Sequence, residues 1–225
     1  MRHEHEPGTI GGVSGRVESV AVAVVRTDPW TRVKSGRSGI DKRPVDGPVR
    51  FTTSGVDGDT ICDVAHHGGP DQAVYAYSTE DLAWWSAELG RPVVTVGQNL
   101  TVSDVNCSGA VLGERWQVGD AVLVVRAPRI PCRVFAGFLD VPDLVRRFTD
   151  ARRPGCYLAV ERAAAVRGGD RVTVLSRPTH GVTVTDLMAA MTGDRTLLPS
   201  VRHAEPDLGE RGREWLARMG RASAD

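Results

Sequence analysis

Short, valine-rich stretches recur along the chain, and several of them alternate apolar with polar residues as half-buried β-strands do. Stretches of this kind cover residues 13–25, 49–54, 73–77, 121–125 and 156–160. The pairs Gly119-Asp120 and Gly169-Asp170 each lead into a valine-rich stretch, so we expect both to be hairpin turns. Many short strands joined by such turns predict a β-barrel.

Helical periodicity occurs in fewer places. Ser78 or Thr79 is predicted to cap a helix with acidic residues in its first turn, and Gly90 is predicted to end it. Trp85 lies on the apolar face of this helix, so we expect it in the core. Further helices are predicted over residues 141–149, 187–191 and 207–219, the first with Leu144, Val145 and Phe148 facing inward.

The strand pattern ends after Arg177-Pro178. We therefore predict a mainly β protein with some helices (α+β), in which residues 1–178 form a β-barrel domain and residues 179–225 a short helical C-terminal extension. The extension is expected to act as a lid or as a dimer contact, and a homodimer is left open. Residues 26–47 are polar and glycine-rich, and no element is predicted there.

The composition is that of an ordinary globular domain. Of the 225 residues 41% are hydrophobic and 25% are charged, and the formal net charge is zero. Without a net basic charge we expect neither a nucleic acid polymer nor a membrane as a partner. The polar residues 1–12 contain no apolar signal-peptide core, so a cytoplasmic protein is expected. The cysteines are widely separated, which disfavours a disulfide framework, a zinc ribbon and an iron–sulfur site.

One cysteine has unusual surroundings. Cys132 follows a predicted strand within the segment Ala127-Pro128-Arg129-Ile130-Pro131-Cys132-Arg133. The two prolines restrict the backbone, so the segment is expected to present its side chains in fixed directions. Nearby positive charge favours the thiolate, which serves as a nucleophile or as a soft-metal ligand. The alternative is a half-buried structural cysteine in a proline-rich turn.

Both lysines of the chain, Lys34 and Lys42, fall in the polar loop, whereas the other 26 basic residues are arginine. A long loop without elements inside a compact domain is often functional. Glycine lets backbone amides approach a ligand closely and the cations add charge, so residues 34–44 suit an anion such as a phosphate. A solvated loop is the alternative.

Two further segments combine glycine with polar side chains. His66 and His67 precede Gly68-Gly69-Pro70, and a zinc site formed with Cys62 lacks enough convergent ligands, so a close backbone approach to a ligand is the better interpretation. Gly97-Gln98-Asn99 lies at a strand junction, where the amides either face a heterocycle or satisfy their own backbone.

Taken together, these segments resemble the MOSC-domain proteins, named for the carboxy-terminal domain of molybdenum-cofactor sulfurases. The resemblance runs from about residue 13 to residue 178 and is strongest for the stand-alone bacterial branch associated with reducing N-hydroxylated purines. Four motifs occur in family order: Gly39-Ile40-Asp41-Lys42-Arg43-Pro44-Val45, His66-His67-Gly68-Gly69-Pro70-Asp71-Gln72-Ala73-Val74, Gly97-Gln98-Asn99-Leu100-Thr101 and Pro128-Arg129-Ile130-Pro131-Cys132.

The resemblance implies a barrel that holds a pterin molybdenum cofactor (molybdopterin), with Cys132 as the ligand to molybdenum and as the catalytic residue. It assigns Lys42, Arg43 and Arg129 to the cofactor's phosphate. The residues that it places beside the pterin or the substrate are His67, Gly68, Gly69, Asp71, Gln98, Asn99 and Leu100. Gln98 departs from the Gly-Glu-Asn-Leu usual in this branch, because the amide keeps an acceptor but loses a charge.

The resemblance also implies a function. We expect a molybdenum-dependent oxidoreductase that reduces N-hydroxylated compounds, has a role in detoxification and receives electrons from a separate reductase. The alternatives are a cofactor carrier or sulfur-transfer module with a persulfide on Cys132, and a non-catalytic interaction domain. Pyridoxal phosphate binding is left open.

Overall fold

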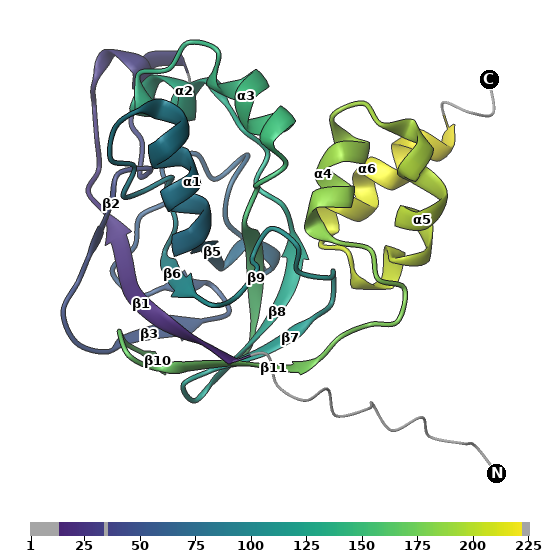
Figure 1. Cartoon of the computed structure of the whole chain (residues 1–225), viewed down its shortest axis with the longest axis horizontal. Coiled ribbons are helices and arrows are strands. Elements are labelled where there is room, and N and C mark those ends of the chain that lie inside the picture. The colour runs from purple at the N-terminus through teal and green to yellow at the C-terminus, as the bar shows by residue number, and fades with distance from the viewer. Residues whose placement is uncertain (1–13, 34–35, 222–225) are drawn as a thin grey trace.

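The computed structural model describes residues 14–33 and 36–221. The barrel strands are β1 (Ser14–Ala23), β5 (Val74–Ser78), β6 (Leu100–Ser103), β7 (Arg115–Val118), β8 (Ala121–Ala127), β9 (Cys156–Arg162) and β11 (Arg171–Ser176). They follow the order β11-β7-β8-β9-β5-β6-β1, and the pairing of β1 with β11 closes the barrel (Figure 1). The predicted α+β class and the β-barrel are therefore confirmed.

Strand β1 shows why closure occurs. Its inward-facing Val17 and Val20 are fully buried, whereas its intervening positions are largely exposed. The register against β6 shifts between Val17 and Ser19, a bulge of the kind that bends a strand. The bent strand pairs with β11 at Ser14–Arg16 and with the short β2 (Lys42–Pro44) near Ala23. A separate small sheet consists of β3 (Val49–Thr52), β4 (Gly55–Val56) and β10 (Ala164–Val166).

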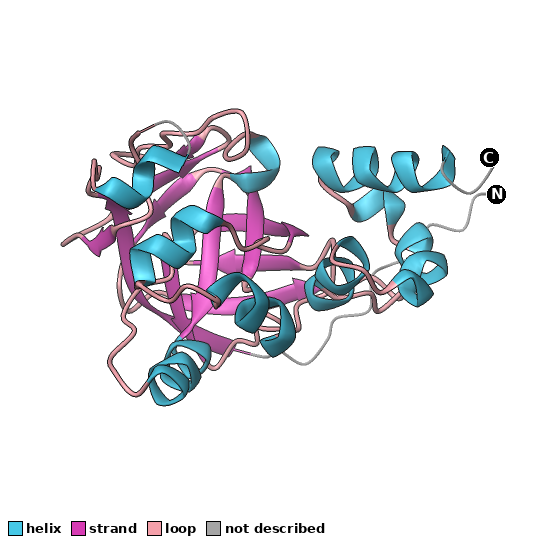
Figure 2. Ribbon diagram, turned by 90° about the horizontal axis from the view of Figure 1, so that it is seen from above, coloured by secondary structure: helices cyan, strands magenta, loops and turns pink. Residues whose placement is uncertain are grey.

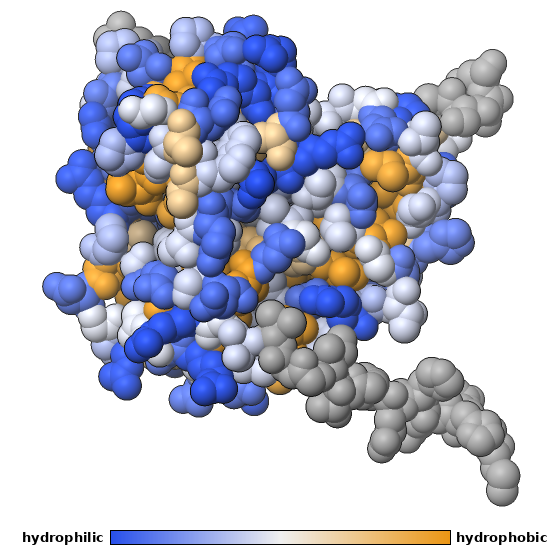
Figure 3. Space-filling model, in the orientation of Figure 1, coloured by the Kyte–Doolittle hydropathy of each residue, from blue (hydrophilic) through white to orange (hydrophobic). Residues whose placement is uncertain are grey.

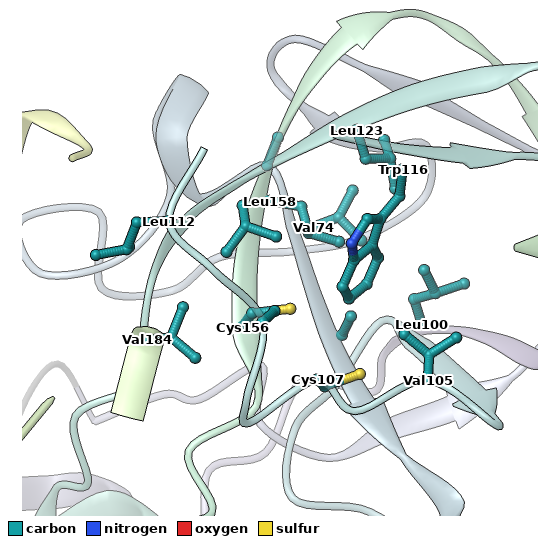
Figure 4. Packing of buried hydrophobic residues seen from close by; sticks show 14 of the residues in the cluster. Val74, Leu100, Val105, Cys107, Leu112, Trp116, Leu123, Cys156, Leu158 and Val184 are labelled. Carbon is teal, nitrogen blue, oxygen red and sulfur yellow. The ribbon is translucent and has the colours of Figure 1, made fainter. Parts of the chain in front are cut away.

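The barrel core continues into the C-terminal extension. Figure 4 shows Trp116 and Leu123 from the β7–β8 hairpin beside Leu158 of β9, with Val184 of the extension also in the cluster. The extension contains α4 (Val184–Met191), α5 (Leu198–His203) and α6 (Glu210–Arg221), which lie to one side of the barrel in both views (Figures 1 and 2). Most of its buried apolar residues belong to the same hydrophobic cluster as the barrel, so the two parts are packed together.

Three helices cover one end of the barrel: α1 (Thr79–Leu89), α2 (Arg133–Leu139) and α3 (Leu144–Ala151) (Figure 1). Ser78 caps α1 by accepting from the Asp81 amide at 3.1 Å, and Gly90 ends it with a left-handed φ of 63°, both as predicted. Trp85 stacks on Phe148 of α3 with ring centroids 5.6 Å apart. A second buried cluster thus fixes these helices over the barrel.

Several local predictions were wrong. The loop assigned to residues 26–47 contains a 3-10 helix (Pro29–Val33) and β2. Helix α2 was not predicted, and Val145 of α3 is 37% exposed although it was expected to face inward. The Gly119-Asp120 hairpin is confirmed, but Gly169-Asp170 connects β10, which pairs with β3, to β11, which pairs with β7 and β1. Pairing with distant strands overrode the local turn signal.

No helix in the described residues is long and apolar enough to cross a membrane. Hydrophilic residues cover most of the face seen in Figure 3, and its apolar patches are small and separate. That face therefore offers no large apolar surface for a dimer contact, and the homodimer stays a prediction.

Candidate functional site

A cavity of about 420 Å³ lies where the barrel loops meet the extension. Its wall takes some of the residues from each of four stretches of the barrel domain, within residues 37–42, 54–75, 97–99 and 127–134, together with Tyr157. Leu187 and Met191 of α4 and Arg211 of α6 complete it. All four sequence motifs contribute to this wall: two of them, residues 66–74 and 128–132, with most of their residues, and the other two with Gly39, Ile40 and Lys42 and with Gly97 and Asn99. The fold thus brings together segments far apart in the sequence.

Cys132 lies at the start of α2 on the cavity wall. Strand β8 ends at Ala127, the two prolines follow, and Cys132 takes the extended N-cap position with φ −137°. Its side chain is half-buried and makes no capping hydrogen bond, so the thiol is not committed to the helix. Of the two flanking arginines only Arg129 lines the cavity, whereas Arg133 is exposed. Of the two arginines that flank Cys132 in the sequence, the structure therefore places only Arg129 in the cavity wall with this thiol.

Arg129 is a buried cation without an acidic partner in the described residues. It is 5% exposed, and its Nη1 donates to the Val96 carbonyl at 2.7 Å. The guanidinium carbon lies 4.3 Å from the centre of the Phe135 ring and 5.3 Å from that of Tyr75. Its Nε has no hydrogen-bond partner. A buried charge normally has a counter-charge, so this wall is suited to an anionic ligand.

Lys42, by contrast, has a carboxylate partner. Its Nζ lies 2.6 Å from Oδ1 and 2.5 Å from Oδ2 of Asp59, and both side chains are 9% exposed. Burial lowers the pKa of Lys42, and the attraction of Asp59 opposes that shift. Both residues line the cavity. The lysine charge is thus balanced within the wall, whereas that of Arg129 is not.

The two histidines have different environments. Burial, followed by the charge of Arg129, lowers the pKa of His67 to about 4, so His67 is neutral near pH 7. His66 is exposed, and its Nδ1 lies 2.9 Å from a carboxylate oxygen of Asp63. In the described part of the chain no group of three His, Cys, Asp or Glu side chains is placed to hold a metal ion. The zinc site weighed from Cys62 with a histidine therefore lacks its ligands.

Other predicted site residues have structural contacts. Arg43 is exposed and pairs with Asp41 at 3.0 Å. Gln98 is buried, and its amide bonds the Val96 amide, the Val94 carbonyl and Thr101 within its own loop. Leu100 is in the barrel core. None of Arg43, Gln98 and Leu100 contributes to the cavity wall.

The glycine-rich motif also contacts the extension. Gly68 lines the cavity, and its φ of 80° favours glycine. Gly69 and Asp71 lie instead in a small pocket at the junction with α6, where Asp71 accepts from the Glu210 amide at 2.8 Å. Arg211 donates to the carbonyl of His66 and, at 3.3 Å, to that of Ala65. Helix α6 therefore holds the loop that carries His67.

Sequence reasoning missed several wall residues, among them Asp59 and Arg211, and considered Cys62 only as a zinc ligand. Asp59 follows a Gly-Val-Asp-Gly turn, where an acidic residue is ordinary, and nothing local indicates that it faces Lys42. Arg211 is one of many arginines on an amphipathic helix. Only the docking of the extension brings it to the His66 loop.

Comparison with known proteins places this architecture in a family. A model of the MOSC domain matches residues 63–173. The uncharacterized protein YflK of Bacillus subtilis (strain 168) is 32% identical over 153 residues, which cover 67% of this chain and 69% of YflK. The structure of YiiM from Geobacillus stearothermophilus superposes with a TM-score of 0.74 at 23% identity, covering 91% of this chain and 98% of that one. The chain belongs to the MOSC-domain family.

A further relative has a name that states an activity. A protein of Gibberella moniliformis (strain M3125 / FGSC 7600) named Reductase is 30% identical over 159 residues, which cover 65% of this chain. The match spans 28% of that longer protein, so the two chains share one domain and not a whole architecture.

Proposed function

We propose that this protein is a molybdenum-cofactor-dependent oxidoreductase that reduces N-hydroxylated compounds, such as N-hydroxylated purines, with Cys132 as the ligand to molybdenum. The observation that carries the proposal is the half-buried thiol of Cys132 on a cavity whose wall includes Arg129, a buried cation that has no acidic partner among the described residues. Membership of the MOSC-domain family and the relative named Reductase support an oxidoreductase.

The cavity has the properties that such a cofactor requires. Its volume of about 420 Å³ falls in the usual range of small-molecule sites, roughly 300–1,000 Å³. Soft thiolate ligands suit a metal such as molybdenum, and the pterin side of the cofactor carries a phosphate that a guanidinium binds well. Arg129 supplies that cation with an unpartnered Nε. The residues present therefore fit the group.

The reaction needs two electrons and two protons for each N–O bond that is broken, and it releases water. When bound, the cofactor supplies a centre that passes the electron pair to the substrate. The Lys42 ammonium is a hydrogen-bond donor on the cavity wall, and neutral His67 can accept or donate there. Tyr157, Leu187 and Met191 add aromatic and apolar side chains to the wall, which would limit the access of water to a bound substrate.

The test is the metal and pterin content of purified protein, compared between the wild type and Cys132→Ala. We expect the variant to lose its molybdenum. It should also lose all turnover of N-hydroxylated substrates when a reduced viologen dye is the electron donor. Cys62→Ala removes a second thiol from the same cavity and is expected to retain the metal. Full molybdenum occupancy with full activity in Cys132→Ala would refute the ligand role.

A second function is favoured by that second thiol. Cys62 and Cys132 line the same cavity, so a persulfide that a sulfur donor forms on Cys132 could pass its outer sulfur to the Cys62 thiol by exchange, as a cofactor carrier or sulfur-transfer module would use. Under this alternative the purified protein binds cofactor or carries labile sulfur on Cys132. It then shows no turnover with N-hydroxylated substrates and the artificial donor.

A further inference from the structure

Asp59 occupies a central position that its local sequence does not indicate. It follows β4 and lines the cavity, and its carboxylate is 9% exposed. The carboxylate contacts three separate segments: it accepts from the Ala23 amide of β1 at 2.8 Å, from Lys42 of β2, and from Asn99 Nδ2 before β6 at 2.9 Å. It therefore links three strands or strand junctions at the cavity.

The hydrogen bonds use the full capacity of this carboxylate. Oδ1 accepts from Ala23 and Lys42, and Oδ2 accepts from Lys42 and Asn99. An ionised carboxylate has about four lone-pair sites, so no acceptor remains for a ligand. An ammonium has three N–H donors, and the two contacts to Asp59 occupy at most two of them. The third donor of Lys42 is left for the cavity, and Asp59 can act on a ligand only through Lys42.

The charges around Lys42 make a counter-ion necessary. The charged or titratable groups with the largest effect on its ammonium are Asp59, Arg129 and Cys62. Burial favours the neutral amine and so does the nearby guanidinium, whereas Asp59 favours the ammonium. Among these groups, Asp59 is the one that carries a carboxylate and can therefore balance the charge of the ammonium. Without it, the buried cations Lys42 and Arg129 would face one cavity, and neither forms an ion pair with another carboxylate among the described residues.

We propose that Asp59 is a positioning residue, which keeps Lys42 in the ammonium form and directs its free N–H into the cavity. The proposal deepens the proposed function, because reduction of an N–O bond needs proton donors at the site. Asp59 itself does not touch the substrate. The hydrogen bonds of Asp59 to Ala23, Lys42 and Asn99 are nevertheless independent of which ligand the cavity holds, and they can be tested without an enzyme assay.

The composition of the chain makes a direct measurement practical. Lys34 and Lys42 are its two lysines, so protein labelled with ¹³C,¹⁵N-lysine gives two side-chain signals in NMR spectra. Lys34→Arg leaves the Lys42 signal alone, and all titrations are performed in that background. We expect Asp59→Asn to move the Lys42 titration midpoint to lower pH, because the amide keeps an acceptor but removes the charge.

Asp57→Asn is the matched control. Asp57 lies in the same turn and carries the same charge, but it is exposed and lies outside the cavity wall. Its replacement is expected to leave the Lys42 midpoint in place. An Asp59→Asn titration that coincides with that of Asp57→Asn would overturn the proposal.

Two further measurements cover the remaining outcomes. Should Asp59→Asn fail to fold, the wild type must still show a ¹H–¹⁵Nζ cross peak of Lys42 at neutral pH, because hydrogen bonds to Asp59 slow exchange of its ammonium protons; absence of that peak would contradict the proposal. In turnover assays, Asp59→Asn is expected to shift the alkaline limb of the pH–rate profile to lower pH. A purely structural defect would lower the rate equally at every pH.

These results separate the two proposals. If the Lys42 midpoint shifts as expected but the protein binds no molybdenum cofactor, the positioning role stands and the proposed function fails. If the cofactor binds and the midpoint does not move, the proposed function stands and Asp59 loses its role.

Discussion

At the scale of single residues, Arg129 is a buried arginine that has no carboxylate partner among the described residues, whereas many arginines of this chain form ion pairs. Its guanidinium is 5% exposed, lies on aromatic rings and has an unpartnered Nε. Burial of an unpaired charge costs free energy of folding, and proteins retain such groups where a ligand supplies the opposite charge. The same charge is favourable for binding and unfavourable for the fold without ligand.

Arg129→Met is therefore expected to weaken cofactor binding while it leaves the thermal stability of the cofactor-free protein unchanged or raised. A lost charge-assisted hydrogen bond costs about 1.5–3 kcal/mol, or roughly a 10- to 100-fold loss in affinity. Cofactor occupancy under limiting supply and melting temperature are the two measurements. Arg133→Met, on the exposed side of α2, is the matched control and should change neither. Equal cofactor occupancy in the two variants would show that Arg129 does not bind the anion of the cofactor.

At the scale of elements, the C-terminal extension is attached to the site by side chains of the glycine-rich motif. Asp71 accepts from the first backbone amide of α6, 139 residues further along the chain, as an N-cap residue does for its own helix. Arg126 adds a contact to Asp71 at 3.7 Å. Since Arg211 of the same helix holds the His66 carbonyl, movement of α6 would release the loop that carries His67.

Asp71→Ala should cost about 0.5–2 kcal/mol of stability, the usual effect of losing a helix cap. We expect faster hydrogen exchange confined to α6 and residues 63–69, and a raised KM, because the extension completes the cavity wall. Glu205→Ala, an exposed acidic residue of the same extension, is the control and should show neither effect. Faster exchange spread over the whole barrel would mean that Asp71 supports the fold in general and not this junction.

At the scale of the whole molecule, the topology bears on where electrons enter. Strands β5 and β6 form the parallel pair of the described sheets, with α1 between them. This single βαβ unit lacks a glycine-rich turn, because Ser78-Thr79 joins strand to helix. Glu80 and Asp81 occupy the first turn of α1, where their charge would repel a dinucleotide phosphate. The unit is thus unsuited to a nicotinamide cofactor.

We therefore expect that metal-replete protein does not turn over an N-hydroxylated purine with NADH or NADPH alone. Addition of a flavin or iron–sulfur reductase, or of a reduced viologen, should start the reaction. The measurement is product formation under each donor in anaerobic buffer. Rapid turnover with the nicotinamide alone would show a cofactor site that neither the sequence nor the fold indicates.

The sequence by itself determined the features that depend on neighbouring residues. Short apolar runs gave β1, β5, β8 and β9. Strand β9 alternates buried with less buried positions, whereas all of β5 and the first five residues of β8 are buried, and either pattern is visible in the sequence without knowledge of the partner strand. Ser78 and Gly90 bounded α1 because capping is satisfied within one turn of the helix. The four motifs and Cys132 were likewise readable, and they led to the family that the comparisons show.

Only the tertiary structure decided which of the predicted site residues meet. Asp59 reaches Lys42 across 17 residues and Asn99 across 40, and such pairings leave no periodic trace in the sequence. The same holds for Gly169-Asp170, whose turn residues are correct for a hairpin although β10 and β11 pair elsewhere. Local patterns record what a segment must bury, whereas closure of the barrel and docking of the extension determine which charges share a cavity.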